Sequence, residues 1–349
     1  MAYITCEDLA LGYEGKAVTE HIHFTVNKGD YLCIIGENGA GKSTLMKTLL
    51  RLIQPISGTI ETGDGLSAYE VGYLPQQTAV QKDFPASVME IVLTGTLNKS
   101  GWKPFYSRQQ KNEARQNMEK MGIWNLRNRC YRELSGGQQQ RTALARILVG
   151  KPRILMLDEP FSALDSYLRE EVEGEVGSLL ANFAGTALLV THNRDEAYRL
   201  CKEMIVLNEG QVLRAGKTKE VFADPQSVAA ARLTGCKNIL PCTPLDSRTV
   251  RLDGWGTTLR LTLPVPAGCI AVGIRAHDFT PCAADAPNAI PVKAVSTSEN
   301  PFDWNLICTS PKGTAQLWWK VGKTSLSAAA PEPPQYLCAA PESIMPLKG

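Results

Sequence analysis

Three short runs of consecutive apolar residues, at positions 31–35, 154–157 and 187–190, stand out in the first 240 residues of the chain. Runs of this length that are apolar at every position are typical of inner strands in a parallel sheet covered on both faces. Segments with apolar residues at helical spacing lie between these runs, and the mostly polar segment 105–132 fits a helical insertion. This alternation of strand and helix patterns predicts an α/β domain.

The pattern changes near residue 240. Beyond it, short runs such as 250–252 and 259–263 alternate between apolar and polar positions, and turn residues separate them. Of the 21 prolines, 14 lie in residues 241–349, together with four of the six tryptophans. Because this pattern is typical of short strands joined by turns, we expect a small all-β domain there. The core of that domain should contain Trp255, Trp304 and one of Trp318 and Trp319, since adjacent residues of a strand face opposite ways.

Composition excludes several classes of protein. The chain of 349 residues carries 37 Lys and Arg against 35 Asp and Glu, so its net charge of +2 argues against a mainly electrostatic nucleic-acid binder. No apolar run approaches the roughly 18–20 residues that cross a bilayer, and the start lacks the basic and apolar regions of a secretory signal. We therefore expect the chain to stay in the cytosol, with its ten scattered cysteines reduced.

A glycine-rich segment, GENGAGKST at 36–44, follows the first apolar run and precedes an amphipathic segment with apolar residues from Leu45 to Ile53. It fits the pattern G-x-x-x-x-G-K-[ST], in which glycines let backbone N–H groups surround phosphate oxygens and the next helix points its positive end at them. Lys42 adds a charge for the β- and γ-phosphates, and the Ser43 hydroxyl ligates Mg²⁺. The predicted nucleotide-binding residues here are Gly36, Asn38, Gly39, Gly41, Lys42, Ser43 and Thr44.

Residues that can take part in catalysis also follow the other two apolar runs. Asp158 and Glu159 follow the second run, and His192 lies just after the third. Ligands of an open α/β sheet bind at the carboxyl ends of its strands. We therefore expect Asp158 to hold Mg²⁺, Glu159 to act as general base on the attacking water, and His192 to contact the γ-phosphate.

Six motifs together resemble the nucleotide-binding subunit of ABC transporters. They are the phosphate loop, VGYLPQ at 71–76, LSGGQ at 134–138, LDEP at 157–160, SALD at 162–165 and TH at 191–192. The match covers roughly residues 3–235, and it implies a P-loop NTPase domain at 1–235 with its helical insertion at about 77–135. Residues 241–349 would then form a separate regulatory-like β domain.

The resemblance also implies roles for individual residues. Tyr13 matches the aromatic residue that stacks on adenine, and Gln76 matches the glutamine that reaches the metal and the attacking water. Asp165 matches an aspartate exchanged across a dimer interface. The signature residues that close over ATP bound to the opposite subunit match Ser135, Gly136, Gly137 and Gln138. Lys42, Gln76, Glu159 and His192 would carry the hydrolysis of ATP.

The same resemblance implies partners. A homodimer of these ATPase subunits would work with integral-membrane permease subunits and an extracytoplasmic substrate-binding protein, without nucleic acid, at the cytoplasmic face of the membrane. Residues 1 to about 140 are similar to zinc/manganese-type importers. Residues from about 150 onward, including GIRAHDF at 273–279, resemble molybdate/sulfate-type ATPases with a regulatory β domain. A metal cation of the zinc/manganese type is the favoured substrate, and an oxyanion such as molybdate is the second.

Other interpretations stay open. The chain could be a soluble ABC protein acting on ribosomes or DNA, although such proteins usually carry two ATPase halves or a long coiled coil. It could be an ion sensor in which ATP is vestigial, although the intact Glu159 and His192 argue against this. The apparent mosaic could be natural or a recombination product. Among the weaker signals, we expect His21 and His23 to be surface residues and the acidic run 169–173 to be a solvated helix face.

Overall fold

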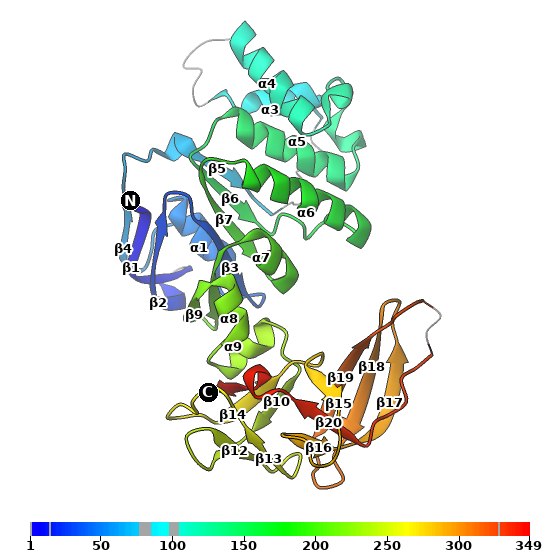
Figure 1. The fold of residues 1–349 in the computed structure, drawn as a ribbon. Coiled ribbons are helices and arrows are strands. Elements are labelled where there is room, and N and C mark those ends of the chain that lie inside the picture. The colour runs from blue at the N-terminus through cyan, green and yellow to red at the C-terminus, as the bar shows by residue number, and fades with distance from the viewer. Residues whose placement is uncertain (1, 14, 77–84, 98–104, 327–328) are drawn as a thin grey trace. The chain divides into compact units, whose positions relative to one another are not determined.

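The computed structural model describes residues 2–13, 15–76, 85–97, 105–326 and 329–349 (Figure 1). Contacts divide the chain into two compact units, residues 1–218 and 219–349, and each unit has its own core. The parts of the expected insertion at 77–84 and 98–104 lie outside the described residues. Within the described part, no helix is long and apolar enough to cross a membrane.

A six-stranded sheet forms the centre of the first unit, in the order β5-β6-β7-β3-β8-β9. The strands from β5 to β8 pair in parallel, and β9 pairs antiparallel with β8. The three apolar runs of the sequence form β3, β6 and β7, and every residue of β6 and β7 is buried. The expected α/β fold is therefore confirmed. The bounds are Val71–Leu74 (β5), Ile154–Asp158 (β6), Thr186–Thr191 (β7), Tyr31–Gly36 (β3), Glu203–Asn208 (β8) and Gln211–Lys217 (β9).

The start of the chain forms an antiparallel sheet with the strand order β2-β1-β4. Its strands are Ala2–Tyr13 (β1), Lys16–Asn27 (β2) and Ser57–Thr62 (β4). Side chains from β1 and β2 join residues of α1, β3, β6, β7 and β8 in one hydrophobic core. This packing ties the antiparallel sheet to the phosphate loop that follows β3.

Three helices of the first unit begin at a serine whose side chain caps the first turn. Ser87, Ser107 and Ser135 each accept a bond from the third residue of their helix, whose side chain bonds back. The helix after the phosphate loop ends at Leu49, so Ile53, the last apolar residue of the amphipathic segment, lies beyond it. The bounds are Lys42–Leu49 (α1), Val88–Thr94 (α3), Arg108–Lys120 (α4), Gly136–Val149 (α5), Ser166–Ala181 (α6) and Arg194–Leu200 (α7), with short 3₁₀ turns at Ala68–Glu70, Trp124–Leu126 and Tyr131–Glu133.

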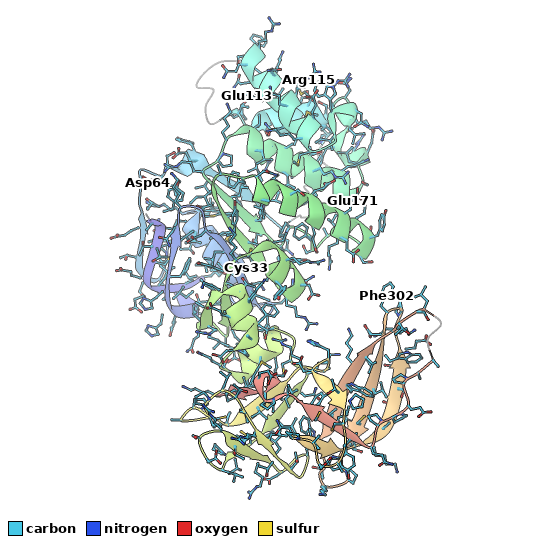
Figure 2. All side chains as sticks on the ribbon, viewed as in Figure 1. Cys33, Asp64, Glu113, Arg115, Glu171 and Phe302 are labelled. Atoms are coloured by element: carbon cyan, nitrogen blue, oxygen red, sulfur yellow. The ribbon has the colours of Figure 1, made fainter. Side chains whose placement is uncertain are left out.

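Among the acidic residues of the run 169–173 on α6, Glu173 is buried although it was expected to be exposed. Glu171, labelled in Figure 2, is exposed as expected. Glu173 is only 4% exposed and pairs with Arg199 of α7 at 2.5 Å. The run therefore has one carboxylate turned into the α6–α7 contact, because the helical period places residue 173 on the same face as the buried Val172 and Val176.

The described residues of the second unit form four three-stranded antiparallel sheets. The additional all-β region of the fold prediction is confirmed, with Trp255 and Trp319 in the core and Trp304 packed against it. Two short helices, Thr218–Ala223 (α8) and Val228–Leu233 (α9), precede the strands. The strand bounds are Asn238–Pro241 (β10), Thr243–Pro244 (β11), Thr249–Leu252 (β12), Thr257–Arg260 (β13), Ala271–Ile274 (β14), Phe279–Pro281 (β15), Ala289–Pro291 (β16), Lys293–Glu299 (β17), Asp303–Thr309 (β18), Gln316–Gly322 (β19), Tyr336–Ala339 (β20) and Met345–Leu347 (β21), with a 3₁₀ turn at Pro341–Ser343.

Arg275, next to β14, joins the helices of this unit to its strands. Its guanidinium donates hydrogen bonds to the backbone oxygens of Thr234 and Phe222, both at 2.5 Å. These carbonyls lie at the carboxyl ends of α9 and α8, where the helix dipole favours a cation. The GIRAHDF segment therefore has a structural function within the second unit.

Candidate nucleotide site

The phosphate loop connects β3 to α1 and depends on glycine at several positions. Gly39 and Gly41 have φ angles of 88° and 89°, in the left-handed region that favours glycine. A Cβ atom on Gly41 would lie 2.3 Å from Cγ2 of Thr19, and one on Gly36 would lie 2.3 Å from the backbone oxygen of Leu207. Larger residues would therefore displace the loop. Asn38 is exposed at its tip, and Thr44 is buried in the first turn of α1.

Lys42 lies inside this loop. Its Nζ atom donates to the backbone oxygens of Gly36 and Glu37 at 2.8 and 2.9 Å. Burial lowers the pKa of the Lys42 ammonium, while the nearby carboxylates of Glu159 and Asp158 act in the opposite direction. The loop thus holds a buried cation whose charge is compensated by the two acids at the end of β6.

A hydroxyl and a carboxylate converge beside Lys42. Ser43 Oγ donates to Oδ1 of Asp158 at 3.3 Å, and the Tyr73 hydroxyl donates to Oδ2 of the same carboxylate at 3.3 Å. Burial raises the pKa of Asp158 despite these two hydrogen bonds. The contact of Tyr73 with Asp158 was not predicted from the sequence. It could have been inferred from the position of Tyr73 on β5, because the next residue, Leu74, pairs with Leu157 directly before Asp158.

These residues fit a nucleotide phosphate and a divalent cation. Gly36 and Gly41 leave no room for a Cβ atom, and a hydroxyl and a buried carboxylate lie side by side, as hard cations prefer. Within the described residues, no group of three or more His, Cys, Asp or Glu side chains could hold a metal ion. His21 and His23 are exposed, as expected, with Asp8 at 2.7 Å from His21.

Glu159 connects the loop to the end of β7. Its side chain is 8% exposed, with Oε1 at 3.8 Å from Nζ of Lys42 and Oε2 at 2.6 Å from Nδ1 of His192. Its backbone has a φ angle of 49°, which is uncommon for a residue other than glycine. The His192 ring is half exposed. The structure therefore brings Lys42, Glu159 and His192 together from three separate segments.

Tyr13 and Gln76 lie at the margins of this cluster. Tyr13 ends β1, is 46% exposed, and its hydroxyl accepts a bond of 3.5 Å from Oγ1 of Thr44. Gln76 is exposed and comes two residues after β5 ends. Because β5 and β6 are parallel neighbours, Gln76 comes after β5 at the same edge of the sheet where Asp158 ends β6.

The signature residues open α5. Ser135 is its N-cap and accepts from the backbone N–H of Gln138 at 3.4 Å, while the Gln138 side chain accepts from the N–H of Ser135 at 3.1 Å. Gly136 and Gly137 form the first helical turn. A Cβ atom on Gly136 would lie 3.3 Å from Cδ2 of Leu164. The SALD segment therefore packs beside the signature.

Asp165, for which the resemblance implies exchange across a dimer, is the N-cap of α6 in this structure. Its Oδ1 accepts from the N–H of Leu168 at 3.0 Å. An aspartate at this position stabilises a helix through an otherwise unpaired N–H group and through the dipole. The carboxylate thus has a defined function within one chain.

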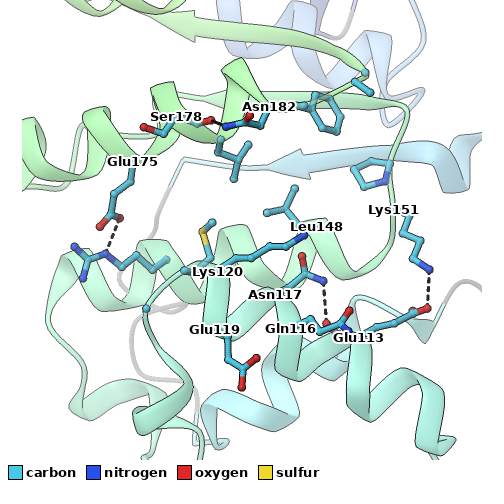
Figure 3. A pocket seen from close by; sticks show the side chains of 18 of the residues that line it. Glu113, Gln116, Asn117, Glu119, Lys120, Leu148, Lys151, Glu175, Ser178 and Asn182 are labelled. Atoms are coloured by element: carbon cyan, nitrogen blue, oxygen red, sulfur yellow. Dashed lines mark hydrogen bonds and ion pairs between the residues drawn. The ribbon is translucent and has the colours of Figure 1, made fainter.

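A separate hollow lies between α4, α5 and α6 (Figure 3). Its volume is about 1460 Å³, and none of the predicted nucleotide-site residues lines it. Ion pairs cross it: Arg141 of α5 contacts Glu171 and Glu175 of α6, and Lys151 contacts Glu113 of α4, at 2.6–2.7 Å. The first two pairs join α5 to α6, and the third joins α4 to the segment that follows α5.

Comparisons with known proteins agree with this geometry. The family model described as ABC transporter matches residues 19–162. The chain is 32% identical over 255 residues to an Fe(3+) ions import ATP-binding protein of Haemophilus influenzae, covering 71% of each chain. It is 31% identical over 215 residues to the high-affinity zinc uptake system ATP-binding protein of Bacillus subtilis, covering 60% of this chain and 93% of that protein.

A solved structure gives the same result. The chain is similar to cbiO1 of Clostridium perfringens, part of an ABC transporter complex, with a TM-score of 0.56 and 27% identity over 64% of this chain and 92% of that one. The fold and the site thus define a P-loop ATPase. The chain belongs to the ATP-binding subunits of ABC transporters, which hydrolyse ATP to power transport.

Proposed function

We propose that this chain drives import of a metal cation, that it works as a dimer on a permease, and that Lys42, Glu159 and His192 carry the hydrolysis. The observation that supports the catalytic part is the buried contact of Glu159 with both Lys42 and His192. Three groups with distinct chemistry meet at one point of the sheet edge, where ligands of open α/β sheets bind.

Each residue has a separate task in this proposal. The Lys42 ammonium binds the β- and γ-phosphates and neutralises their charge. Glu159 accepts a proton from the water that attacks the γ-phosphate. His192, at 2.6 Å from Glu159, orients that carboxylate and contacts the γ-phosphate. When bound, Mg²⁺ supplies further charge neutralisation, and Ser43, Asp158 and Gln76 are the residues that would hold it.

The remaining predicted residues would bind the rest of the nucleotide. The exposed ring of Tyr13 is available to stack on adenine. The N-terminus of α5, opened by Ser135, Gly136 and Gly137, is suited to a phosphate. In a dimer, this end would close over the ATP of the opposite chain, and Asp165 would approach the interface.

A metal cation is the favoured cargo because two relatives are named for metal import, one for Fe(3+) and one for zinc. The segment from Gln76 to Glu133, which resembles zinc/manganese-type importers, would form the groove that receives the permease. An oxyanion such as molybdate stays the second possibility. That relatives are import subunits also favours transport over an action on ribosomes or DNA.

The test combines catalysis with partner choice. The chain is co-expressed with a zinc-type, an Fe(3+)-type and a molybdate-type permease, and co-purification and ATP hydrolysis are measured for each pair. We expect stable complexes and increased hydrolysis with a metal-cation permease. Co-purification with the molybdate-type permease alone would overturn the cargo, while absence of ATP hydrolysis in every pair would overturn the catalytic proposal.

A further inference from the structure

The segment that carries His192 is fixed by hydrogen bonds on both sides of the histidine. Thr191 ends β7 before it, and Asn193 follows it as the N-cap of α7. The N–H of Asn193 donates to Oγ1 of Thr191 at 3.0 Å, which closes a turn around His192. The side chain of Asn193 in turn accepts from the N–H of Asp195 at 2.9 Å. The backbone of His192 therefore has little freedom.

Glu196, in the first turn of α7, determines how Thr191 makes these bonds. The Thr191 hydroxyl donates to Oε2 of Glu196 at 2.5 Å, and both side chains are almost fully buried. A hydroxyl has one proton to donate. Because this proton is used in the hydrogen bond to Glu196, Oγ1 is oriented with a lone pair toward the N–H of Asn193. A hydrogen-bonded chain thus runs from Glu196 through Thr191 to the turn at His192.

The buried position of Glu196 costs folding free energy, which a residue with a purely local function would not need to spend. An acidic residue in the first turn of a helix can interact with the helix dipole from the surface. Glu196 is instead 3% exposed and lies near the carboxylates of Glu173 and Glu159, with Arg169 as a nearby cation. Cys33 of β3, labelled in Figure 2, also lies within electrostatic reach of Glu196. Burial of a carboxyl beside other acids opposes folding.

We infer that Glu196 and Thr191 are positioning residues that aim His192 at Glu159. This inference rests on the proposed function of His192 and Glu159. The hydrogen-bonded chain sets the backbone at residues 191–193, and this backbone sets the His192 ring at 2.6 Å from Oε2 of Glu159. Neither positioning residue needs to touch the nucleotide.

The first test replaces the hydroxyl at 191. Thr191→Val keeps the shape and removes both bonds, whereas Thr191→Ser keeps the hydroxyl. We expect Thr191→Val to lower kcat roughly 10- to 100-fold, the order of loss that a misplaced catalytic group produces, with the affinity for ATP unchanged. Thr191→Ser should restore most of kcat. Glu196→Gln retains an acceptor and should fall between wild type and Glu196→Ala.

Thr186 provides a matched control at the opposite end of β7. It is equally buried, and its hydroxyl accepts from the N–H of Gly29 at 2.9 Å and donates to the oxygen of Asn27 at 3.0 Å. Thr186→Val therefore also removes two hydrogen bonds from a buried threonine. It should lower the melting temperature about as much as Thr191→Val does and leave kcat unchanged.

A double-mutant cycle separates positioning from general damage. If Thr191 acts through the histidine, Thr191→Val should cause no further loss of kcat in the His192→Ala background. An equal loss in both backgrounds, or an unchanged kcat in a folded Thr191→Val protein, would overturn the inference. The proposed function would fail separately, if His192→Ala and Glu159→Gln both hydrolysed ATP at the wild-type rate.

Discussion

The Nζ atom of Lys42 lies 3.8 Å from Oε1 of Glu159, and the two side chains are only 6% and 8% exposed. Neither charge would be stable at this depth alone, because a buried ion without a partner is strongly destabilising. The pair joins the phosphate loop to the end of β6, and His192 attaches the end of β7 to the same carboxylate.

Substitution of the two partners should therefore have different effects on nucleotide. Lys42→Ala should abolish ATP binding, because the cation for the phosphates is lost. Glu159→Gln should keep binding and block turnover, because an amide cannot accept the proton of the attacking water. Equilibrium binding of a fluorescent ATP analogue and phosphate release measure the two properties. Equal loss of binding in both purified variants would contradict these roles.

Two glycines inside α6 allow a test of helix stability. A Cβ atom on Gly174 would meet nothing within 4 Å, whereas one on Gly177 would lie 3.3 Å from Cδ2 of Leu200. Glycine in a helix interior costs about 1 kcal/mol relative to alanine. Gly174→Ala should therefore raise the free energy of unfolding by up to about 1 kcal/mol, measured by urea denaturation. Gly177→Ala should give a smaller gain or a loss, because Leu200 must shift. A larger gain at 177 than at 174 would show that α6 packs differently.

The buried carboxyl of Glu196 predicts a dependence of stability on pH. Burial raises its pKa, the hydrogen bond from Thr191 opposes this, and Glu173 adds to the rise. Between the unfolded and the raised folded pKa, the folded state holds a proton that the unfolded chain has released. Stability from this group therefore falls as the pH rises through that window. The Glu196→Gln variant lacks this titration.

Measured against wild type, Glu196→Gln should gain stability as the pH rises above about 4.3, the usual glutamate value, and the difference should level off at lower pH. Urea denaturation at a series of pH values gives this difference. Glu170→Gln, at an exposed position of α6, is the matched control and should show no comparable trend. A difference that declines with rising pH would mean that Glu196 is stabilised in its charged form.

The central sheet could be predicted because its strands are apolar at every position, and the phosphate loop because its chemistry requires a fixed spacing. Lys42, Asp158 and Glu159 could be proposed as site residues for the same reason. Tyr73, Thr191 and Glu196 were missed because they act through contacts between elements, which no local spacing encodes. The burial of Glu173 has the same explanation, since the exposure of an acidic helix face depends on which helix packs against it.

The second unit should modulate ATP hydrolysis without being required for it, because every predicted nucleotide-site residue, from Tyr13 to His192, lies before residue 218. The end point of a truncation matters. A chain ending at Leu240 keeps α8 and α9 but loses Arg275, which binds the ends of both helices. A chain ending at Thr218 removes the whole second unit. We expect the shorter chain to be folded and to hydrolyse ATP, and the longer one to be less stable.

Hydrolysis by the full chain and by the chain ending at Thr218 should then be compared with and without molybdate. If the β region senses an oxyanion, only the full chain should respond. Coupling between two sites is typically about 1–3 kcal/mol, or roughly 5- to 150-fold in affinity for ATP. Should the shorter chain fold but fail to hydrolyse ATP, the second unit is part of the catalytic machinery. If molybdate changes neither chain, the regulatory function fails, and the role of the β region is structural.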